Sequence, residues 1–217
     1  MLENLINSIK HYPILESSTA HVALALVLDI SGSMQGEKID SLNNAINNMI
    51  AQIKEDARLR DIVDLAVFVF GEEGRDPVCQ GFRAISDCGY ITLQANDNET
   101  WVSNALDTAV DRLRERTNLY AQGGGAYKPW LILITDGQFF DGEELNTIAS
   151  KMKQRESDNK LQFFGLGVQG YDRGQLEMLT NRPNHVIDVK AVNFVEFFCW
   201  YRCNFAVDEL EPLVFRT

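Results

Sequence analysis

Cysteine is scarce in this chain of 217 residues, which contains only four. The N-terminus carries an early acid and no apolar core followed by a small-residue cleavage site, so no secretion signal is visible. We therefore expect a cytoplasmic protein with reduced thiols rather than a disulfide framework. Cys199 and Cys203 lie one helical turn apart in an apolar segment. They either pack in the core or supply two of the ligands of a zinc site.

Long apolar runs and basic residues are also in short supply. No uncharged run approaches the roughly 20 residues that a membrane-spanning helix needs. The 20 lysines and arginines are outnumbered by 31 aspartates and glutamates, which leaves a formal net charge of -11. That excess of acid opposes unaided binding to nucleic acid or to an anionic membrane, and a cation or a basic partner fits it better. The three histidines are scattered and form no ligand pattern.

Apolar residues, by contrast, are abundant and regularly placed. With 45% hydrophobic and 24% charged residues, the chain can form one globular domain built on a two-sided sheet. Apolar or β-branched runs predict strands at 22–29, 62–70, 130–135, 161–168 and 185–189. Apolar residues at three- and four-residue spacing predict helices after 36, from about 102 to 113, at 141–157 and near 172–180.

This alternation of strands and helices predicts the fold class. We expect an α/β domain with a doubly wound, mostly parallel central sheet of about six strands, flanked by helices on both faces. Weaker strand signals around 78–93 indicate an edge strand and a long loop. One domain is expected over residues 1–217, with a lead-in at 1–18 and a C-terminal helix at 191–206.

The most informative stretch runs from Leu24 to Met34, where a buried strand ends in Asp29 and a short turn of hydroxyls and glycine. The strand at 130–135 ends in the same way, with Asp136 followed by glycine. If the two strands are neighbours, both carboxylates reach one edge of the sheet, where a topological switch point opens a crevice.

Such an edge predicts a divalent metal site. Ser31 and Ser33 lie two residues apart in the turn, so that both hydroxyls can face one point, and Thr100 at the start of a later helix can add a third. Together with Asp29 and Asp136 they offer five oxygens, the donors that Mg²⁺ and similar hard cations (Mn²⁺ or Ca²⁺) accept. A sixth coordination position stays open for another ligand.

The order Asp29, Ser31, Ser33, Thr100 and Asp136 resembles the metal-ion-dependent adhesion site of the von Willebrand factor A domain family. The resemblance implies that the serines and the threonine contact the metal and that the acids act directly or through water. It also implies that an Asp or Glu of a partner protein fills the vacant position.

Further segments resemble the bacterial branch of this family that is associated with tellurium resistance: 36–39, 127–130 and 197–200. This resemblance implies a role in tellurite or related stress. One departure lies beside Thr100, where that branch usually has a glycine pair and this chain has Asn98 and Glu99. Glu99 either points into solvent or offers the metal an internal carboxylate; in the second case the domain is a structural subunit with a degenerate site.

Other interpretations compete at the same residues. Ser31 and Ser33 are also suited to capping the following helix. Asp29 is placed where phosphotransferases and hydrolases keep a nucleophile, although no lysine follows the later strands at a suitable position. The glycines at 165, 167 and 170 match a dinucleotide fingerprint, but in a late strand unit, which favours close packing and a turn. We predict a non-enzymatic protein-binding domain that depends on a divalent cation; its oligomeric state stays open.

Overall fold

The structure is a computed structural model, which describes residues 19–71, 76–96, 101–168 and 170–189. The predicted lead-in at 1–18 and the predicted C-terminal helix lie outside the described residues. So do Cys199 and Cys203.

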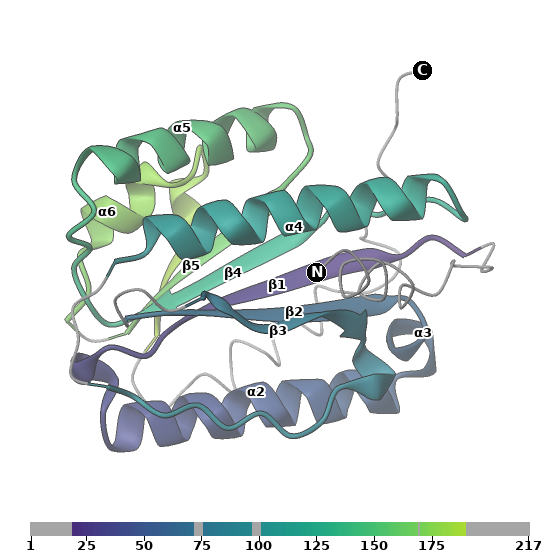
Figure 1. The fold of residues 1–217 in the computed structure, drawn as a ribbon, viewed down its shortest axis with the longest axis horizontal. Helices are drawn as coiled ribbons and strands as arrows, with labels where there is room; N and C mark the ends of the chain where they lie inside the picture. Colours follow the sequence, from purple (N-terminus) through teal and green to yellow (C-terminus); the bar gives the residue numbers. More distant parts are fainter. Residues whose placement is uncertain (1–18, 72–75, 97–100, 169, 190–217) are drawn as a thin grey trace, which may run out of the picture.

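A six-stranded sheet forms the centre of the molecule, in the order β3-β2-β1-β4-β5-β6 (Figure 1). Every neighbouring pair is parallel except β2 and β3, which are antiparallel. The predicted fold class is therefore confirmed, and the weak strand signal after residue 77 is an edge strand. The strands are β1 (Val22–Asp29), β2 (Val63–Phe70), β3 (Val78–Ala84), β4 (Trp130–Thr135), β5 (Gln162–Val168) and β6 (Val186–Val189).

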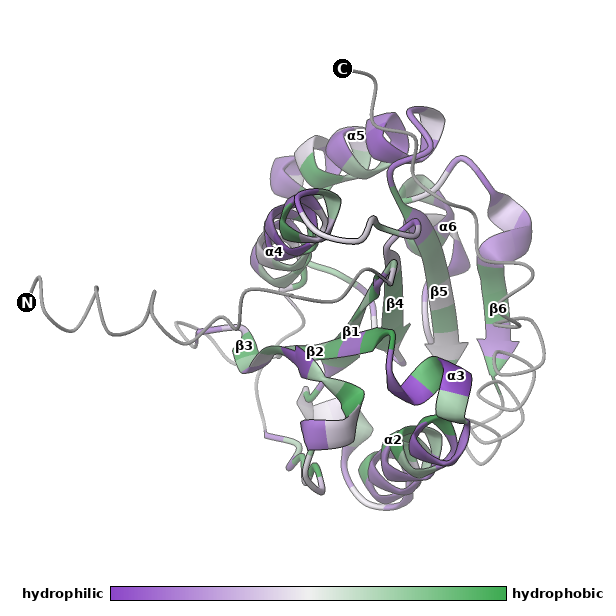
Figure 2. Cartoon of the chain, turned by 90° about the vertical axis from the view of Figure 1, so that its right-hand side faces the viewer, coloured by the Kyte–Doolittle hydropathy of each residue, from purple (hydrophilic) through white to green (hydrophobic). Residues whose placement is uncertain are grey.

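Helices cover both faces of this sheet, and the end-on view in Figure 2 shows the three layers. Helices α4 (Ser103–Ala121), α5 (Glu143–Ser157) and α6 (Arg173–Met178) lie on one side; α2 (Glu37–Glu55) and α3 (Ala57–Arg60) lie on the other (Figure 1). The sequence pattern does not predict α3, because four residues are too few to show a periodicity. No helix among these described elements is long and apolar enough to cross a bilayer.

Strand β1 is buried along its whole length because both of its faces pack against helices. Alternate side chains point to opposite faces of a strand. Leu24, Leu26 and Leu28 join the core on the α2 side, whereas Ala23 and Ala25 join the core that contains α4 and α5. A strand held on two faces and by two neighbours is a rigid base for the turn that follows it.

Strand β1 lies between β2 and β4, and the chain leaves it on one side towards β2 and returns on the other side as β4. This is the topological switch point of the sheet. Leu28 is level with Ile134 in the register of the two strands. Asp29, at the end of β1, and Asp136, directly after β4, therefore lie at the same edge of neighbouring strands, which is the condition on which the predicted metal site depended.

Candidate metal centre

Asp29 is fully buried at the end of β1, and both of its carboxylate oxygens accept hydrogen bonds. Oδ1 accepts from the backbone N of Ser31 at 2.9 Å and from Ser31 Oγ at 2.6 Å. Oδ2 accepts from Thr135 Oγ1 on β4 at 2.6 Å. Burial raises the pKa of Asp29 and the nearby Asp136 carboxylate adds to this, while the hydrogen bonds from Ser31 and Thr135 oppose it. The carboxylate is thus held in one orientation.

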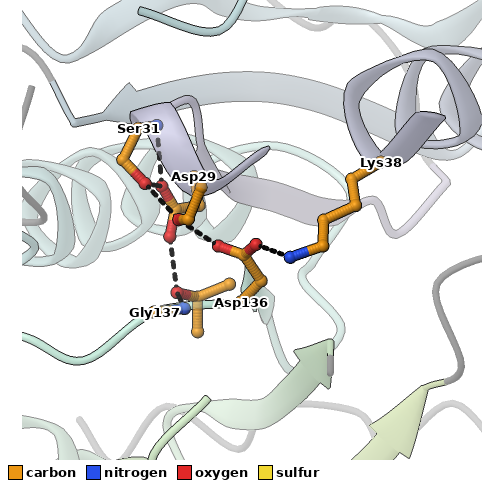
Figure 3. Close-up of polar contacts among 7 residues, drawn as sticks. Asp29, Ser31, Lys38, Asp136 and Gly137 are labelled. Atoms are coloured by element: carbon orange, nitrogen blue, oxygen red, sulfur yellow. Dashed lines mark hydrogen bonds and ion pairs between the residues drawn. The ribbon is translucent and has the colours of Figure 1, made fainter. Parts of the chain in front are cut away.

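The two serines continue a row of oxygens from Asp29 towards the surface. Ser31 Oγ lies 3.1 Å from Ser33 Oγ, and Ser33 Oγ donates to Asp136 Oδ1 at 2.5 Å. Figure 3 shows how Asp29, Ser31 and Asp136 face one another. Asp29 is buried whereas Ser33 is exposed. The row therefore begins in the interior and reaches solvent at Ser33.

Neither serine caps the following helix, so the capping interpretation is wrong. Residues Gly32–Met34 form a short 3₁₀ helix, and the Ser31 side chain makes no capping hydrogen bond to it. Helix α2 begins after Gly36, which has a φ of 73° and no side chain to cap with. Both hydroxyls are used within the row of oxygens instead.

The donor set fits a hard divalent cation. In an octahedron with metal–oxygen bonds of about 2.1 Å, adjacent oxygens lie about 3 Å apart. The successive spacings from Asp29 to Asp136 are 2.6, 3.1 and 2.5 Å, so the oxygens need to separate by only a few tenths of an ångström. No group of three histidine, cysteine or acidic side chains within the described ranges is arranged as a metal site. Hydroxyls thus supply half of the donors that the structure brings together.

Lys38, from the first turn of α2, is a member of the site that the sequence analysis missed. Its Nζ forms an ion pair with Asp136 Oδ2 (Figure 3). No lysine follows the later strands at a suitable position. Here the lysine comes from the helix that follows the first turn, and a helix start beside the sheet edge is not visible in the spacing of residues.

The fifth predicted ligand, Thr100, lies outside the described residues, as does Glu99. The described residues that flank 97–100 form hydrogen bonds with the loops after β1 and β4. Asn96 N donates to Ile30 O at 2.9 Å. The backbone nitrogens of Val102 and Ser103 donate to the Asp141 carboxylate at 3.0 and 2.7 Å. The described residues that flank 97–100 thus contact the loops after β1 and β4.

The sequence profile of the von Willebrand factor type A domain matches residues 23–198. The chain belongs to this family. No curated protein matches the sequence.

Solved structures support the fold of this von Willebrand factor type A domain. Proximal thread matrix protein 1 from the mussel byssus, with a zinc-occupied MIDAS (metal-ion-dependent adhesion site) motif, has 17% identity and a TM-score of 0.61 over 87% of this chain and 47% of its own. The open pilus adhesin SpaC from Lactobacillus rhamnosus GG has 17% identity and a TM-score of 0.63 over 89% of this chain and 30% of its own. The chain spans less than half the length of either protein.

A third structure matches the domain nearly end to end. The vWF domain of the type V pili tip protein Mfa5 from Porphyromonas gingivalis has 11% identity and a TM-score of 0.60, over 91% of this chain and 99% of its own. At such identities the similarity shows the fold.

Two asparagines of α2 hold the segment at residues 91–93 of this domain. Asn47 accepts from Ile91 N at 2.8 Å and donates to Ile91 O at 2.7 Å. Asn43 does the same with Leu93, at 2.8 and 2.9 Å. The sequence analysis did not detect this role. Its only signal is a pair of asparagines four residues apart beside the apolar face of the helix.

Gly71, directly after β2, is a further residue whose role was not predicted from the sequence. A Cβ at this position would lie 2.6 Å from the backbone N of Ser31, and its φ is +107°. Only glycine allows the chain to pass so close to the backbone of Ile30 and Ser31 without strain. Residue 71 thereby lets β2 pack against the loop that carries the serines.

The glycines of β5 are packing residues, as the sequence analysis favoured over a dinucleotide fingerprint. A Cβ on Gly167 would lie 2.2 Å from the Tyr171 ring, and one on Gly165 would touch Leu176 at 3.5 Å. Gly170 has a φ of +109° in the turn that follows.

The two histidines among the described residues, His21 and His185, are placed away from the candidate site. His21 directly precedes β1 and His185 directly precedes β6, so both lie at the opposite edge of the parallel sheet from Asp29. Cys79 and Cys88 are free thiols, as expected. Among the described residues, the groups gathered around Asp29 and Asp136 are thus oxygen atoms together with the Lys38 ammonium.

Proposed function

We propose that this domain holds a divalent cation at the carboxyl edge of β1 and β4 and uses it to bind a carboxylate of a protein partner. The observation that carries the proposal is the continuous row of oxygens from Asp29 through Ser31 and Ser33 to Asp136. Mg²⁺ is the cation that we favour, with Mn²⁺ and Ca²⁺ as substitutes.

Each residue of the site has a distinct part in this function. The hydroxyls of Ser31, Ser33 and Thr100 would ligate the cation. Asp29 and Asp136 would balance its charge and orient its waters. With two formal negative charges from the protein, a divalent cation attracts a further carboxylate. The exposure of Ser33 gives a partner Asp or Glu access to that position.

Two exposed aromatic residues, Trp101 and Phe140, follow Thr100 and Asp136 closely in the sequence and suggest the character of the partner. Trp101 is 47% exposed and Phe140 is 55% exposed. Trp101 precedes Val102, and Phe140 precedes Asp141. Because Val102 N donates to the Asp141 carboxylate, the two aromatic residues lie on adjacent loops. Large exposed aromatic residues are typical of binding surfaces. We therefore expect a partner segment that carries an acid beside an apolar side chain.

Metal binding is the first test. Wild-type protein should bind Mn²⁺ in a titration that follows the loss of the free-ion electron paramagnetic resonance signal. Ser33→Ala should weaken binding by about tenfold or more, because it removes a hydroxyl donor. Ser150→Ala, an exposed serine on α5, is the matched control and should bind as the wild type does. Absence of Mn²⁺ binding to wild-type protein would contradict the proposal.

Partner binding is the second test. Proteins captured from a bacterial lysate by the immobilised domain should be released by a chelator and should be absent with Ser33→Ala. Capture that ignores both changes would show that the cation has no part in binding.

One observation favours a second candidate, a metal-dependent phosphotransferase or hydrolase. Lys38 pairs with Asp136 in a site that also contains Asp29, and phosphate-transfer sites likewise combine a lysine with two acids. Against it, Asp29 is buried and accepts hydrogen bonds on both oxygens, which leaves neither free to attack a substrate. Turnover of a generic phosphoester that is lost in Asp29→Ala would favour this candidate.

A cytoplasmic role in bacterial tellurite or related stress is a further proposal, supported by the resemblance of residues 36–39, 127–130 and 197–200 to the tellurium-resistance branch. Expression of the chain in a bacterial host should raise the tellurite concentration that inhibits growth. The Ser33→Ala variant should not.

A further inference from the structure

Lys38 occupies a position that helix stability does not explain. It lies in the first turn of α2, where the positive end of the helix dipole favours acids over cations. The same turn holds Glu37 and Asp40, as this rule leads one to expect. The contact that accounts for a lysine here is Asp136, a residue 98 positions away in the sequence.

Asp136 is engaged on both oxygens, from two directions. Ser33 Oγ donates to Oδ1 at 2.5 Å, and the Lys38 ammonium pairs with Oδ2. The Asp136 side chain is 0% exposed, whereas that of Lys38 is 28% exposed. A divalent cation that draws on Asp136 therefore meets an ammonium on the same carboxylate. The ammonium and the divalent cation would repel each other, and the repulsion is stronger beside a buried carboxylate than in water.

We infer that Lys38 competes with the divalent cation for Asp136, so that lysine and metal are alternative counter-ions of this carboxylate. The inference rests on the proposed function of the site. The lysine has a flexible four-carbon stem and already reaches solvent, so its ammonium can leave Asp136 without unfolding α2. Asp136 and the turn at Ser33 can stay in place while the ammonium moves.

The competition makes metal affinity a property of the partner as well as of the domain. Because the cation has to displace Lys38, it is held weakly by the domain alone. A partner carboxylate adds negative charge beside the cation and strengthens its binding. Coupling of this kind is reciprocal, so the cation strengthens the partner's binding by the same factor. Lys38 thereby ties retention of the metal to the presence of the partner.

The experiment compares Mn²⁺ affinity, measured by electron paramagnetic resonance, between wild-type protein, Lys38→Met and Lys38→Gln. Both variants should bind Mn²⁺ about tenfold or more tightly than wild type, since a competing charge is gone. Lys160→Met is the matched control. It removes the same charge from an exposed position just before β5, at the opposite edge of the sheet, and should stay within about twofold of wild type. Thermal unfolding checks that each variant is folded.

Each combination of results decides between the two proposals. If wild type binds Mn²⁺ and both Lys38 variants bind equally or more weakly, Lys38 is not a competitor, while the proposed metal site stands. If only the variants bind, the competition is supported, while the proposed metal-dependent function of the wild-type domain is wrong because Lys38 blocks its site. If neither wild type nor variants bind, both proposals are wrong.

Discussion

Thr135 on β4 donates a hydrogen bond of 2.6 Å to Asp29 at the end of β1. Both side chains are completely buried. This bond joins the two strands that deliver the candidate metal ligands, and Gly137 N in turn donates to Thr135 Oγ1 at 3.1 Å. One hydroxyl thus orients the first acid of the site and the loop that carries the second.

Thr135→Val should lower the free energy of unfolding by about 1–3 kcal/mol, because it leaves a buried carboxylate oxygen without this donor. Mn²⁺ affinity should fall with it. Urea denaturation measures the first effect, and Thr135→Ser, which keeps the hydroxyl, should restore most of it. Thr147→Val on the exposed face of α5 is the control. Equal stability of Thr135→Val and Thr147→Val would show that the bond to Asp29 is energetically unimportant.

Asn47→Ala should lower the free energy of unfolding by about 1–3 kcal/mol, because it removes the side chain that bonds the backbone N and O of Ile91. Mn²⁺ affinity should decrease as well, since the segment at Ile91 leads to the predicted ligand Thr100. Urea denaturation and Mn²⁺ titration report the two effects. Asn48→Ala, the next residue of α2 and exposed, should change neither.

Trp101→Ala with Phe140→Ala should weaken binding of the metal-dependent partner by tenfold or more, because exposed aromatic anchors dominate interface energies. Mn²⁺ affinity and stability should not change. Leu119→Ala is the control, since Leu119 is 42% exposed on α4, near its C-terminal end. Retention of the partner by the double variant would place the docking surface elsewhere.

His21→Phe should make the stability of the domain less sensitive to acid. Burial lowers the pKa of His21, and the carboxylate of Asp64 opposes this only in part. The unfolded chain therefore takes up a proton before the native domain does, and stability falls as the pH drops below about 6.5. Neither ring nitrogen of this buried histidine has a hydrogen-bond partner, and its ring stacks on Tyr120.

At pH 7.5 the phenylalanine variant should therefore differ from wild type by less than about 1.5 kcal/mol in urea denaturation. At pH 5.5 it should be the more stable protein. His185→Phe is the comparison: burial lowers the pKa of His185 too, but its Nδ1 lies 2.9 Å from Phe163 O, so its removal should cost stability at pH 7.5. The prediction would be contradicted if the free energy of unfolding of His21→Phe fell as much between pH 7.5 and pH 5.5 as that of wild type.

Gly167→Ala should destabilise the domain by about 1–3 kcal/mol, because the new methyl group would overlap the Tyr171 ring. Gly165→Ala places its methyl group in ordinary contact with Leu176 and should cost less than about 1 kcal/mol. Urea denaturation distinguishes the two. If wild type bound a dinucleotide and Gly165→Ala did not, the glycines would instead be a dinucleotide-binding fingerprint.

Strands β1 and β4 could be predicted to the residue from the sequence, because each is a continuous apolar run that ends in an acid. Helix α2 could be predicted because its apolar residues recur on one face. The roles of Lys38 and Asn47 could not, since both depend on partners 98 and 44 residues away. Their side chains resemble the rest of a solvated helix face until the opposite loops are in place.

What the sequence by itself determined is the alternation of elements, the family, and the order of the five candidate oxygen ligands, because apolar periodicity and short-range spacing are local properties of the chain. That Asp29, Ser31, Ser33 and Asp136 bind a metal stays a prediction, and so does the role of Thr100. Only the tertiary structure decided that β1 and β4 are neighbours, that four of these residues form one row, and that Lys38 pairs with Asp136. Those facts depend on strand order and on where helix α2 begins, which arise from packing across the whole sheet.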